Sequence, residues 1–586
     1  MGQSYDYSIQ SVRLRVLGDL FRGCVIPAGV IFLALRLAGI RLGFISGALV
    51  FPVAALTGSY LLSVYRDHVD AREANKLGAI TVPRVKGNLP GNLDVLFRLL
   101  RNQERGYMMD AFSELYKECN STTVNLRILW TDKYITMDSE HIKYIYNAGF
   151  SKFWRGHTQK EIVECFLGTG ILNRDDDEWK THRMIARPFF ASDRVSHLDL
   201  FERHAQKAMS VMLNTDPGDS LDFEDLVARF TVDAASEFLF GENLNTLSYG
   251  KDGFNSFTNA FMAIQALIRK RSTVGDWWPL LELFKDKSEG HKRTIRSWVD
   301  PLVVRAVRIQ KEMKEKGQSV NPDDCTFLEY LATTTQDVEV IRDQLLNILL
   351  AARDTTTALV SHVVYFFAEH PDVLKKAREE ILEALGPEGT PTVENMRGLK
   401  YLRAVLNETL RLFSPLPGSL RGTRDQGVAF PRSDATHNSP PMYVPPRTPI
   451  ATMPYLMQRN KALWGPDAEE FKPDRWFDPE VLKTVAANSS VFVPFASGPR
   501  SCIGQNYALN EATLFLVRLL QRFEEFTIDE RKQLSPPWTK DPTIDMGLKH
   551  SRGGTSRKGI ERIWPGFTIV IHIRGGLWMR FKKASE

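Results

Sequence analysis

The sequence contains few cysteines, and none of them has a metal-binding spacing. Its 5 cysteines among 586 residues (Cys24, Cys119, Cys165, Cys325 and Cys502) lie far apart and form no C-x-x-C or C-x-x-H pattern. This spacing excludes a structural zinc set, and an odd number of scattered cysteines argues against a disulfide framework. We therefore expect the main body of the chain to lie in a reducing compartment.

The chain also lacks a strong excess of charge of either sign. It has 75 Lys and Arg against 70 Asp and Glu, a net charge of +5 with a pI of about 8.7. An excess this small does not indicate a nucleic-acid-binding protein, although it suits a modest basic patch facing an acidic protein or an anionic membrane. The length and the hydrophobic content of 43% are sufficient for a large core.

Long uncharged runs are absent except near the N-terminus. Residues 42–64 form an uncharged run of 23, long enough to cross a bilayer as a helix. We predict an anchor region at 1–65 with its main span at 42–64, a linker at 66–91 and one folded body at 92–586. The shorter run at 24–35 is either a second, interrupted span or an interfacial helix.

Two alternatives to an anchor are a cleavable signal peptide and a buried pair of core helices. The first is disfavoured because the apolar stretch is too long and too far from Met1. Basic residues flank residues 42–64 equally on both sides, so the positive-inside rule does not set the orientation of a single span.

The rest of the chain has mainly helical periodicity with a few strand-like segments, so we expect a mainly α fold with small β-sheets. Residues 337–370 predict one helix about 50 Å long, ended by Pro371. Strands are expected at 124–130 and 134–137, at 416–421, and in a final hairpin pairing 567–573 with 577–581. The stretches 427–449 and 535–557 are interpreted as irregular surface excursions with no chemistry.

Cys502 lies in a loop punctuated by Gly498 and Gly504, two residues after Arg500 and directly before a helical run. A helix N-terminus and a nearby cation both lower the pKa of a cysteine, so this position favours a thiolate. A buried thiolate needs a metal or a base, and a lone cysteine suits a metal whose other ligands come from elsewhere. The ordinary alternative is a buried cysteine near a helix start.

Two residue pairs elsewhere have helical spacing that suits chemistry. Trp179 and Arg183 are four apart and share a helix face, where both can contact one anion; a surface cation over a ring is the commoner outcome. Asp354 and Thr355 stand in the middle of the long apolar helix, where a carboxylate is costly unless it is satisfied or used. Threonine there can bond the i−4 carbonyl and bend the helix; the alternative is an exposed polar face.

These motifs together resemble those of cytochromes P450. Phe495-x-x-Gly498-x-Arg500-x-Cys502-x-Gly504 matches the family's haem-binding signature at all five fixed positions. The other matching motifs, in the family order, are Trp179-x-x-x-Arg183, Asp354-Thr355, Glu408-x-x-Arg411 and Pro473-x-Arg475-Trp476. One departure is Ala352, where the family usually has glycine. Ala-Ala-Arg-Asp-Thr-Thr and the late Gly-Gly-Leu-Trp resemble the fungal membrane-bound members that include alkane and fatty-acid hydroxylases.

The resemblance implies a P450 fold behind the membrane anchor and a haem b (iron protoporphyrin IX) with Cys502 as axial ligand. The residues it implies around the haem are Phe495 and Gly504 near the sulfur, and Trp179, Arg183, Arg421 and Arg500 at the propionates. Asp354 and Thr355 are implied to deliver protons during oxygen activation. By itself the pair Glu408 and Arg411 is usually a surface ion pair. The resemblance adds Arg475 and makes the three a structural lock.

The implied activity is insertion of one oxygen atom of O2 into a hydrophobic substrate, with a fatty acid or alkane as first choice. Electrons would come from an NADPH–cytochrome P450 reductase, with cytochrome b5 as an optional second donor. The implied location is the endoplasmic reticulum membrane, with a single- or double-pass anchor and the catalytic domain facing the cytosol. The alternatives are oxidation of polycyclic aromatics, other xenobiotics or a secondary-metabolite intermediate, rearrangement of peroxides without external electrons, and a haem sensor without turnover.

Overall fold

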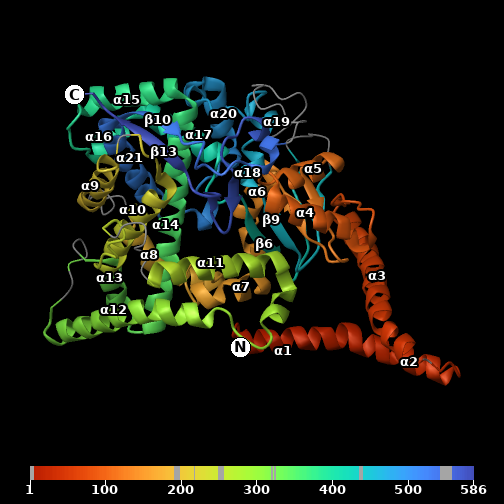
Figure 1. Ribbon diagram of the computed structural model, residues 1–586. Helices are drawn as coiled ribbons and strands as arrows, with labels where there is room; N and C mark the ends of the chain where they lie inside the picture. The colour runs from red at the N-terminus through yellow and green to blue at the C-terminus, as the bar shows by residue number, and fades with distance from the viewer. Residues whose placement is uncertain are drawn as a thin grey trace.

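The computed structural model describes residues 5–41, 43–190, 198–216, 218–248, 256–318, 321, 325–433, 440–540 and 557–585. Its body is built around α14 (Val338–Glu369), which runs through the middle of the molecule in Figure 1. Asp337 caps this helix by accepting hydrogen bonds from the backbone N–H groups of Glu339 and Val340, and Pro371 follows its end. The predicted helix at 337–370 is therefore present almost to the residue.

The other helices of the body pack around α14 or cover its neighbours. The helices of the first half are α4 (Leu93–Arg105), α5 (Asp110–Glu118), α6 (Ser139–Tyr146), α7 (His157–Leu167), α8 (Asp176–Phe189), α9 (Asp199–Leu213), α10 (Phe223–Phe240), α11 (Ser256–Val274), α12 (Glu289–Glu315) and α13 (Phe327–Thr334). Those of the second half are α15 (Pro371–Leu385), α16 (Val393–Gly398), α17 (Lys400–Leu412), α18 (Pro454–Met457), α19 (Lys461–Trp464), α20 (Pro479–Ala487) and α21 (Gln505–Arg522). Short 3-10 helices relevant below are η5 (Gly275–Glu282), η6 (Pro473–Phe477) and η8 (Gly498–Arg500).

Four small sheets complete the body. The largest has the order β2-β3-β9-β6-β4, with β3 and β9 parallel and the other pairs antiparallel. Its strands are β2 (Thr123–Asn125), β3 (Tyr134–Thr136), β4 (Phe153–Trp154), β6 (Ser419–Thr423) and β9 (Pro449–Thr452). The predicted hairpin at 124–137 is thus present, with a shorter first strand than expected, and β6 matches the strand expected near 416–421.

The final predicted hairpin is wrong. Strand β13 (Trp578–Lys583) pairs antiparallel with β10 (Phe523–Ile528) and β5 (Leu221–Asp222), whereas β11 (Pro565–Phe567) pairs with β12 (Ile571–Ile573). Alternation and turn residues indicate strands but do not select the partner, and here the partners come from distant parts of the chain.

The two stretches interpreted as surface excursions are also partly buried. Strands β7 (Val428–Phe430) and β8 (Met442–Val444) form a sheet with β1 (Ile80–Thr81), and Phe430 and Val444 are fully buried. In the second stretch, Arg557 is buried and binds the buried Glu561, with Nε and Oε2 3.0 Å apart. Residues 434–439 and 541–556 of these stretches lie outside the described residues.

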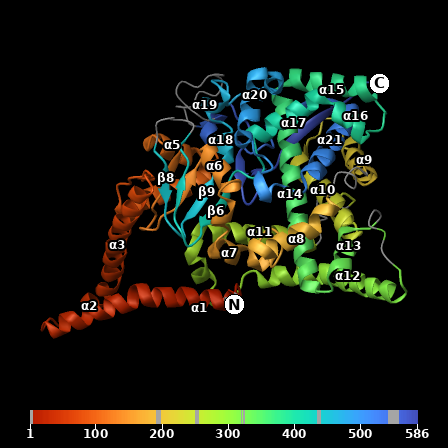
Figure 2. The same ribbon diagram turned by 180° about the vertical axis from the view of Figure 1, so that it is seen from behind.

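An N-terminal helical pair projects from the body in Figures 1 and 2. Its first arm comprises α1 (Ile9–Leu20), a π-helical turn η1 (Phe21–Val25) and α2 (Ile26–Leu37), and its second arm is α3 (Phe44–Lys76). Two segments, Ile9–Leu37 and Ala48–Lys76, are long and apolar enough to cross a membrane. The helix that contains the predicted span at 42–64 therefore continues well beyond residue 65.

Candidate active site

The Cys502 loop is built by one turn, η8, and by the start of α21. Gly498 has a φ of +69°, and a Cβ there would lie 2.0 Å from the carbonyl oxygen of Tyr146, so only glycine fits. The backbone N–H of Cys502 donates to the carbonyl of Phe495 at 2.9 Å, which closes the loop. A Cβ on Gly504 would meet only the sulfur of Cys502, at 4.0 Å, so this side of the loop is left open.

The Cys502 side chain is exposed, yet many protein atoms lie around it. Their burial of the thiol is the main influence on its pKa. It therefore borders an open space inside the body. Burial raises the pKa of the thiol, and the Gly504 N–H and the Arg183 guanidinium oppose the rise without overcoming it. The helix start thus lowers the pKa as expected, but burial outweighs it, which agrees with the expectation that a thiolate buried at this position needs a metal or a base.

Arginines gather near this loop from separate elements. Arg500 binds the buried Asp175, with Nη2 and Oδ1 2.7 Å apart, and its guanidinium lies 4.4 Å from the ring centroid of Trp179. Arg183 donates from Nη1 to the Ser501 carbonyl at 2.9 Å. Arg421, on β6, donates only to the nearby Ser419 and Leu420 in the described hydrogen bonds.

A further arginine, Arg155, belongs to this group and carries no motif in the sequence. Its Nε is buried without a hydrogen-bond partner among the described residues. Burial, with repulsion from Arg421 and Arg500, lowers the pKa of Arg155 to about 9. Burial also lowers the pKa of Arg500, to about 10. Arg155, Arg421 and Arg500 thus repel one another beside the buried Asp175, which also binds Lys160 at 2.9 Å, and this excess of cations makes a site for an anion of more than one charge.

The acid–alcohol pair lies in the middle of α14. The Thr355 hydroxyl donates to the Ala351 carbonyl at 2.6 Å, the i−4 bond expected from the sequence. Asp354 is tied to Arg353, with Nη1 and Oδ1 2.8 Å apart, and also bonds Gln265 of α11. Burial raises the pKa of Asp354. This carboxyl therefore takes up a proton more readily than a carboxyl in water.

A glycine-containing loop fastens α7 and α8 to the first half of α14. The Thr169 N–H donates to Asp343 at 2.8 Å. A Cβ on Gly168 would lie 2.0 Å from Asp343, and one on Gly170 would lie 2.0 Å from the Asn347 amide. Burial raises the pKa of Asp343 to about 6. The two glycines allow the loop to approach the helix closely, and this contact fixes where α8 presents Trp179 and Arg183.

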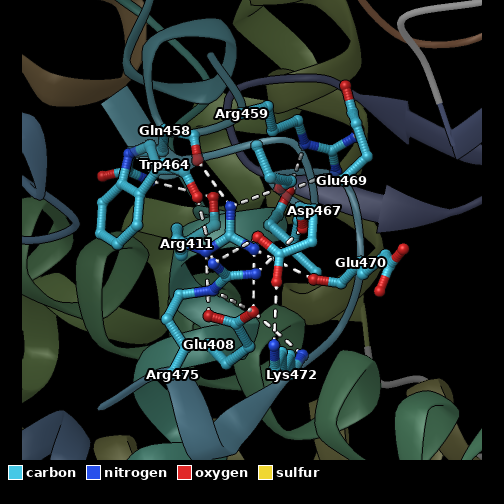
Figure 3. Close-up of polar contacts among 12 residues, drawn as sticks. Glu408, Arg411, Gln458, Arg459, Trp464, Asp467, Glu469, Glu470, Lys472 and Arg475 are labelled. Carbon is cyan, nitrogen blue, oxygen red and sulfur yellow. Dashed lines mark hydrogen bonds and ion pairs between the residues drawn. The ribbon is translucent and has the colours of Figure 1, made fainter. Parts of the chain in front are cut away.

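Glu408, Arg411 and Arg475 form the buried cluster shown in Figure 3. The Arg411 guanidinium binds both Glu408 oxygens, at 2.9 and 2.8 Å. Its remaining donors bind the carbonyls of Gln458, Ala468 and Glu470 at 2.6–3.1 Å. Arg475 binds Glu408 at 3.3 Å. Burial opposes ionisation of Glu408, but the two guanidiniums outweigh it and lower its pKa.

This cluster is remote from solvent and therefore is not the surface ion pair that the spacing alone favours. Both side chains of the pair Glu408 and Arg411 have 0% exposure. Trp476 and the Lys472 N–H complete the carboxylate's bonds, at 3.2 and 3.0 Å. The structure thus brings together all three residues of the predicted lock, joining α17 to η6.

A sequence model of the family described as cytochrome P450 matches residues 88–551. The chain belongs to the cytochrome P450 family. It is a monooxygenase of mainly helical P450 fold. Members of this family hold a haem with a cysteine thiolate on the iron. They act on hydrophobic substrates and receive electrons from a redox partner.

Among the relatives of this P450 is the cytochrome P450 monooxygenase himC of Aspergillus japonicus, 33% identical over 78% of this chain and 79% of its own length. Cytochrome P450 52A12 of Debaryomyces hansenii is 32% identical over 80% of this chain and 91% of its own length. Cytochrome P450 52A5 of Candida maltosa is 34% identical over 77% and 86%, respectively. The haem domain of cytochrome P450DA shares the fold, with a TM-score of 0.65 at 19% identity over 86% of this chain and 98% of that one.

The residues of this P450 fit a haem. The Cys502 thiol is exposed, and burial by nearby protein atoms disfavours its ionisation without a partner; the Arg155 Nε has no hydrogen-bond partner among the described residues. A haem would meet both features, because its iron would take a thiolate ligand and its propionates would pair with guanidiniums. Sequence motifs identified Trp179, Arg183, Arg421 and Arg500; only the folded arrangement identified Arg155.

Proposed function

We propose that Cys502 is the axial ligand of a haem b and that this P450 hydroxylates a lipid-like substrate, a fatty acid or an alkane. The observation that carries the cofactor assignment is the combination of an interior thiol open to a space with an arginine group short of anionic partners. Arg155, Arg183, Arg421 and Arg500 hold the propionates, and Trp179 supports Arg500. The Phe495 carbonyl accepts the hydrogen bond of the Cys502 N–H, and we assign to the Phe495 ring the shielding of the sulfur.

When bound, the haem supplies the activation of O2 and its transfer to a carbon–hydrogen bond. The chain itself supplies protons and exclusion of water. Burial raises the pKa of Asp354, which makes this carboxyl a better proton acceptor than one in water, and Gln265 and Arg353 position it. Thr355 exposes its hydroxyl oxygen as an acceptor while its proton is held by the Ala351 carbonyl. We infer that protons pass from solvent to Asp354 and then to the Thr355 hydroxyl.

The choice of substrate is supported by the relatives and by the N-terminal helices. Several relatives are cytochromes P450 of the 52 series from yeasts, such as 52A12, 52A5 and 52E2, and the sequence resembles the fungal alkane and fatty-acid hydroxylases. An anchored enzyme meets substrates that partition into the bilayer. A second candidate is a substrate of another kind, such as an aromatic xenobiotic or an intermediate of secondary metabolism, because himC and fsdH, which lie outside the 52 series, are about as similar to this chain.

The proposed setting is the cytosolic face of the endoplasmic reticulum membrane, with an NADPH–cytochrome P450 reductase as electron donor. The predicted anchor region at 1–65 extends to Lys76, where α3 ends, so the connection to the haem domain at 92–586 is shorter than the predicted linker at 66–91.

The cofactor assignment is tested by the carbon-monoxide complex of the reduced protein. The wild-type chain is expected to show the absorption shift that marks a thiolate ligand, and Cys502→Ser is expected to lose it while keeping its helical circular dichroism. A wild-type protein that binds haem without this shift would refute the assignment. Incubating reductase-containing membranes with NADPH and a panel of fatty acids, alkanes and aromatics identifies the substrate class by mass spectrometry of the products.

The proton path is tested by Thr355→Ala, which is expected to divert NADPH electrons from product to hydrogen peroxide. Thr273→Ala is the matched control, because the Thr273 hydroxyl makes the same i−4 bond, to the Arg269 carbonyl at 3.0 Å, on an exposed part of α11. The ratio of product to NADPH consumed is the measurement. Equal ratios in both variants would contradict the role of Thr355.

A further inference from the structure

Both outer ends of the N-terminal helical pair are bound to the same body. We call residues 9–76, comprising α1, η1, α2 and α3, the N-terminal hairpin. At its first end, the Tyr5 hydroxyl donates to Glu161 at 2.5 Å, and Arg15 binds the other oxygen of the same carboxylate at 2.5 Å. The Glu161 side chain has no exposed surface. The Tyr5 ring also stacks on His157, with centroids 3.8 Å apart.

Apolar packing strengthens this first attachment. Val12 and Val16 of α1 are buried, and Arg13 donates to the Glu282 carbonyl of η5. Residues 5–9 also line a cavity of about 760 Å³ between α7, α11, α12 and α14. The start of the chain is thus part of the body's surface.

The second end is fixed by a separate set of contacts. Asp67 of α3 binds Arg84 at 2.6 Å and Arg127 at 2.6 Å. Ala74 is buried, and the chain then enters β1, which pairs with β8. In Figures 1 and 2 the two arms leave the body at different places and meet beyond α2, away from it.

Between the two attachments the hairpin presents apolar side chains that no described part of the protein covers. Only 6% and 12% of the most apolar stretches of the two arms are buried. This excludes the buried pair of core helices that the sequence left open. Exposed large apolar residues of the arms include Val30, Leu33, Leu37, Val53, Leu56 and Leu61.

The apolar parts of the two arms differ in length. In the second arm, residues 44–64 of the uncharged run are helical and about 32 Å long, against a hydrocarbon thickness of about 30 Å. The first has 13 uncharged residues, 23–35, about 20 Å long. Arg22 and Arg36 bound this run, and their long side chains extend its reach by snorkelling to the headgroups on either side. The run begins inside the π-helical turn η1, which follows the docked helix α1.

We propose that the N-terminal hairpin crosses a lipid bilayer twice and keeps both of its ends on the side that holds the catalytic body. One rigid body cannot lie on both sides of a membrane, and it binds both ends. The connection between α2 and α3 then lies on the opposite side. This inference depends on neither the cofactor nor the substrate.

For a single span, the basic residues on the two sides were equal in number. For two spans, the positive-inside rule favours one orientation. The basic residues on the side of the body are Arg13, Arg15, Arg22, Arg66, Arg72 and Lys76, and those near the connection between α2 and α3 are Arg36 and Arg41. Six basic residues against two place the body on the cytosolic side. The occupant of the apolar surface is therefore the lipid of a cytosol-facing membrane.

The test uses the full-length chain in sealed microsomes, with one epitope tag before Met1 and another after Glu586. Added protease is expected to remove both tags to the same extent, since both ends face the cytosol. A glycosylation acceptor in a flexible insert within 38–43 is expected to be modified, as shown by a mobility shift that an endoglycosidase reverses. The carbon-monoxide spectrum verifies that each variant is folded.

A protected N-terminal tag beside a digested C-terminal one would overturn the proposal and leave a single span. A digested N-terminal tag with an unmodified insert would also overturn it, because the hairpin would then enter only one leaflet. Recovery of the chain in the soluble fraction without detergent would show that a protein surface, not lipid, covers the hairpin.

Discussion

Replacing Glu408 with glutamine tests how much the buried lock contributes to stability. The Glu408 carboxylate has no exposed surface and accepts hydrogen bonds from Arg411, Arg475, Trp476 and the Lys472 backbone. Glutamine has nearly the same shape but no charge, and its NH2 group faces donors in place of an acceptor. The Arg411 guanidinium would then remain in the interior without a counter-charge, whereas Arg475 would keep its ion pair with Asp467 at 2.9 Å.

Breaking a buried ion pair by removing one partner costs about 3–5 kcal/mol. Since folded domains are stable by about 5–15 kcal/mol, this loss is a large share of the total. The folded-to-unfolded ratio is expected to fall by roughly 10²- to 4 × 10³-fold. Arg411 uses all of its donors on Glu408 and three carbonyls, so its position cannot relax without breaking further bonds.

The measurement is the urea midpoint of purified protein, together with the haem-to-protein ratio after expression. Glu379→Gln is the matched control, because Glu379 pairs with Lys375 at 3.9 Å on the surface of α15 with its side chain 66% exposed. That change is expected to alter stability by less than about 1 kcal/mol. Equal midpoints and haem contents for the two variants would refute the reasoning.

The same carboxylate predicts a pH dependence. The pKa of Glu408 is lower in the folded protein than in the unfolded chain, because the Arg411 and Arg475 guanidiniums outweigh burial. Its contribution is therefore complete above the unfolded pKa and is lost as the pH falls through the folded one. Glu408→Gln is expected to lack this part of the acid destabilisation.

Three further changes test the surroundings of the haem site. Arg155→Gln is expected to speed haem loss about tenfold, since a hydrogen bond to a charged group contributes about 1.5–3 kcal/mol. The rate is measured by transfer of haem to an acceptor protein. An unchanged rate would show that Arg155 does not bind a propionate. Burial raises the pKa of Asp343 to about 6 in the folded protein. The free energy of unfolding should therefore decline by about 3 kcal/mol as the pH rises from about 4 to 6. Asp343→Asn should flatten this decline in urea titrations. Gly170→Ala, whose Cβ would meet Asn347, is expected to cost about 1–3 kcal/mol, whereas Gly290→Ala, with open space around it, should be neutral or slightly stabilising in the same titrations.

Local patterns predicted the features that depend on nearby residues. The limits of α14 followed from helical periodicity, the Asp337 cap and Pro371. The Cys502 loop followed from glycine positions that the backbone requires, as Gly498 shows. The pairing of Glu408 with Arg411 followed from a three-residue spacing on α17, although the same spacing could not show that the pair is buried.

The sequence patterns did not predict contacts between distant segments. Strand β13 pairs with β10 and β5, while its alternation pattern fits any neighbouring strand. Arg557 and Glu561 are buried by residues far away, including Tyr107 and Tyr365, although their own segment is polar. Pairing partners and burial are set by packing, which a local pattern does not record.

The sequence by itself determined the family, the central helix and the motif residues, because each depends on residue types at fixed short spacings. The tertiary structure alone decided that Arg155 joins Arg421 and Arg500, that burial raises the pKa of the Cys502 thiol, and that both ends of the N-terminal hairpin bind one body. Electrostatic repulsion and desolvation depend on distances through space and on the atoms that exclude water. Those quantities exist only once the chain has folded.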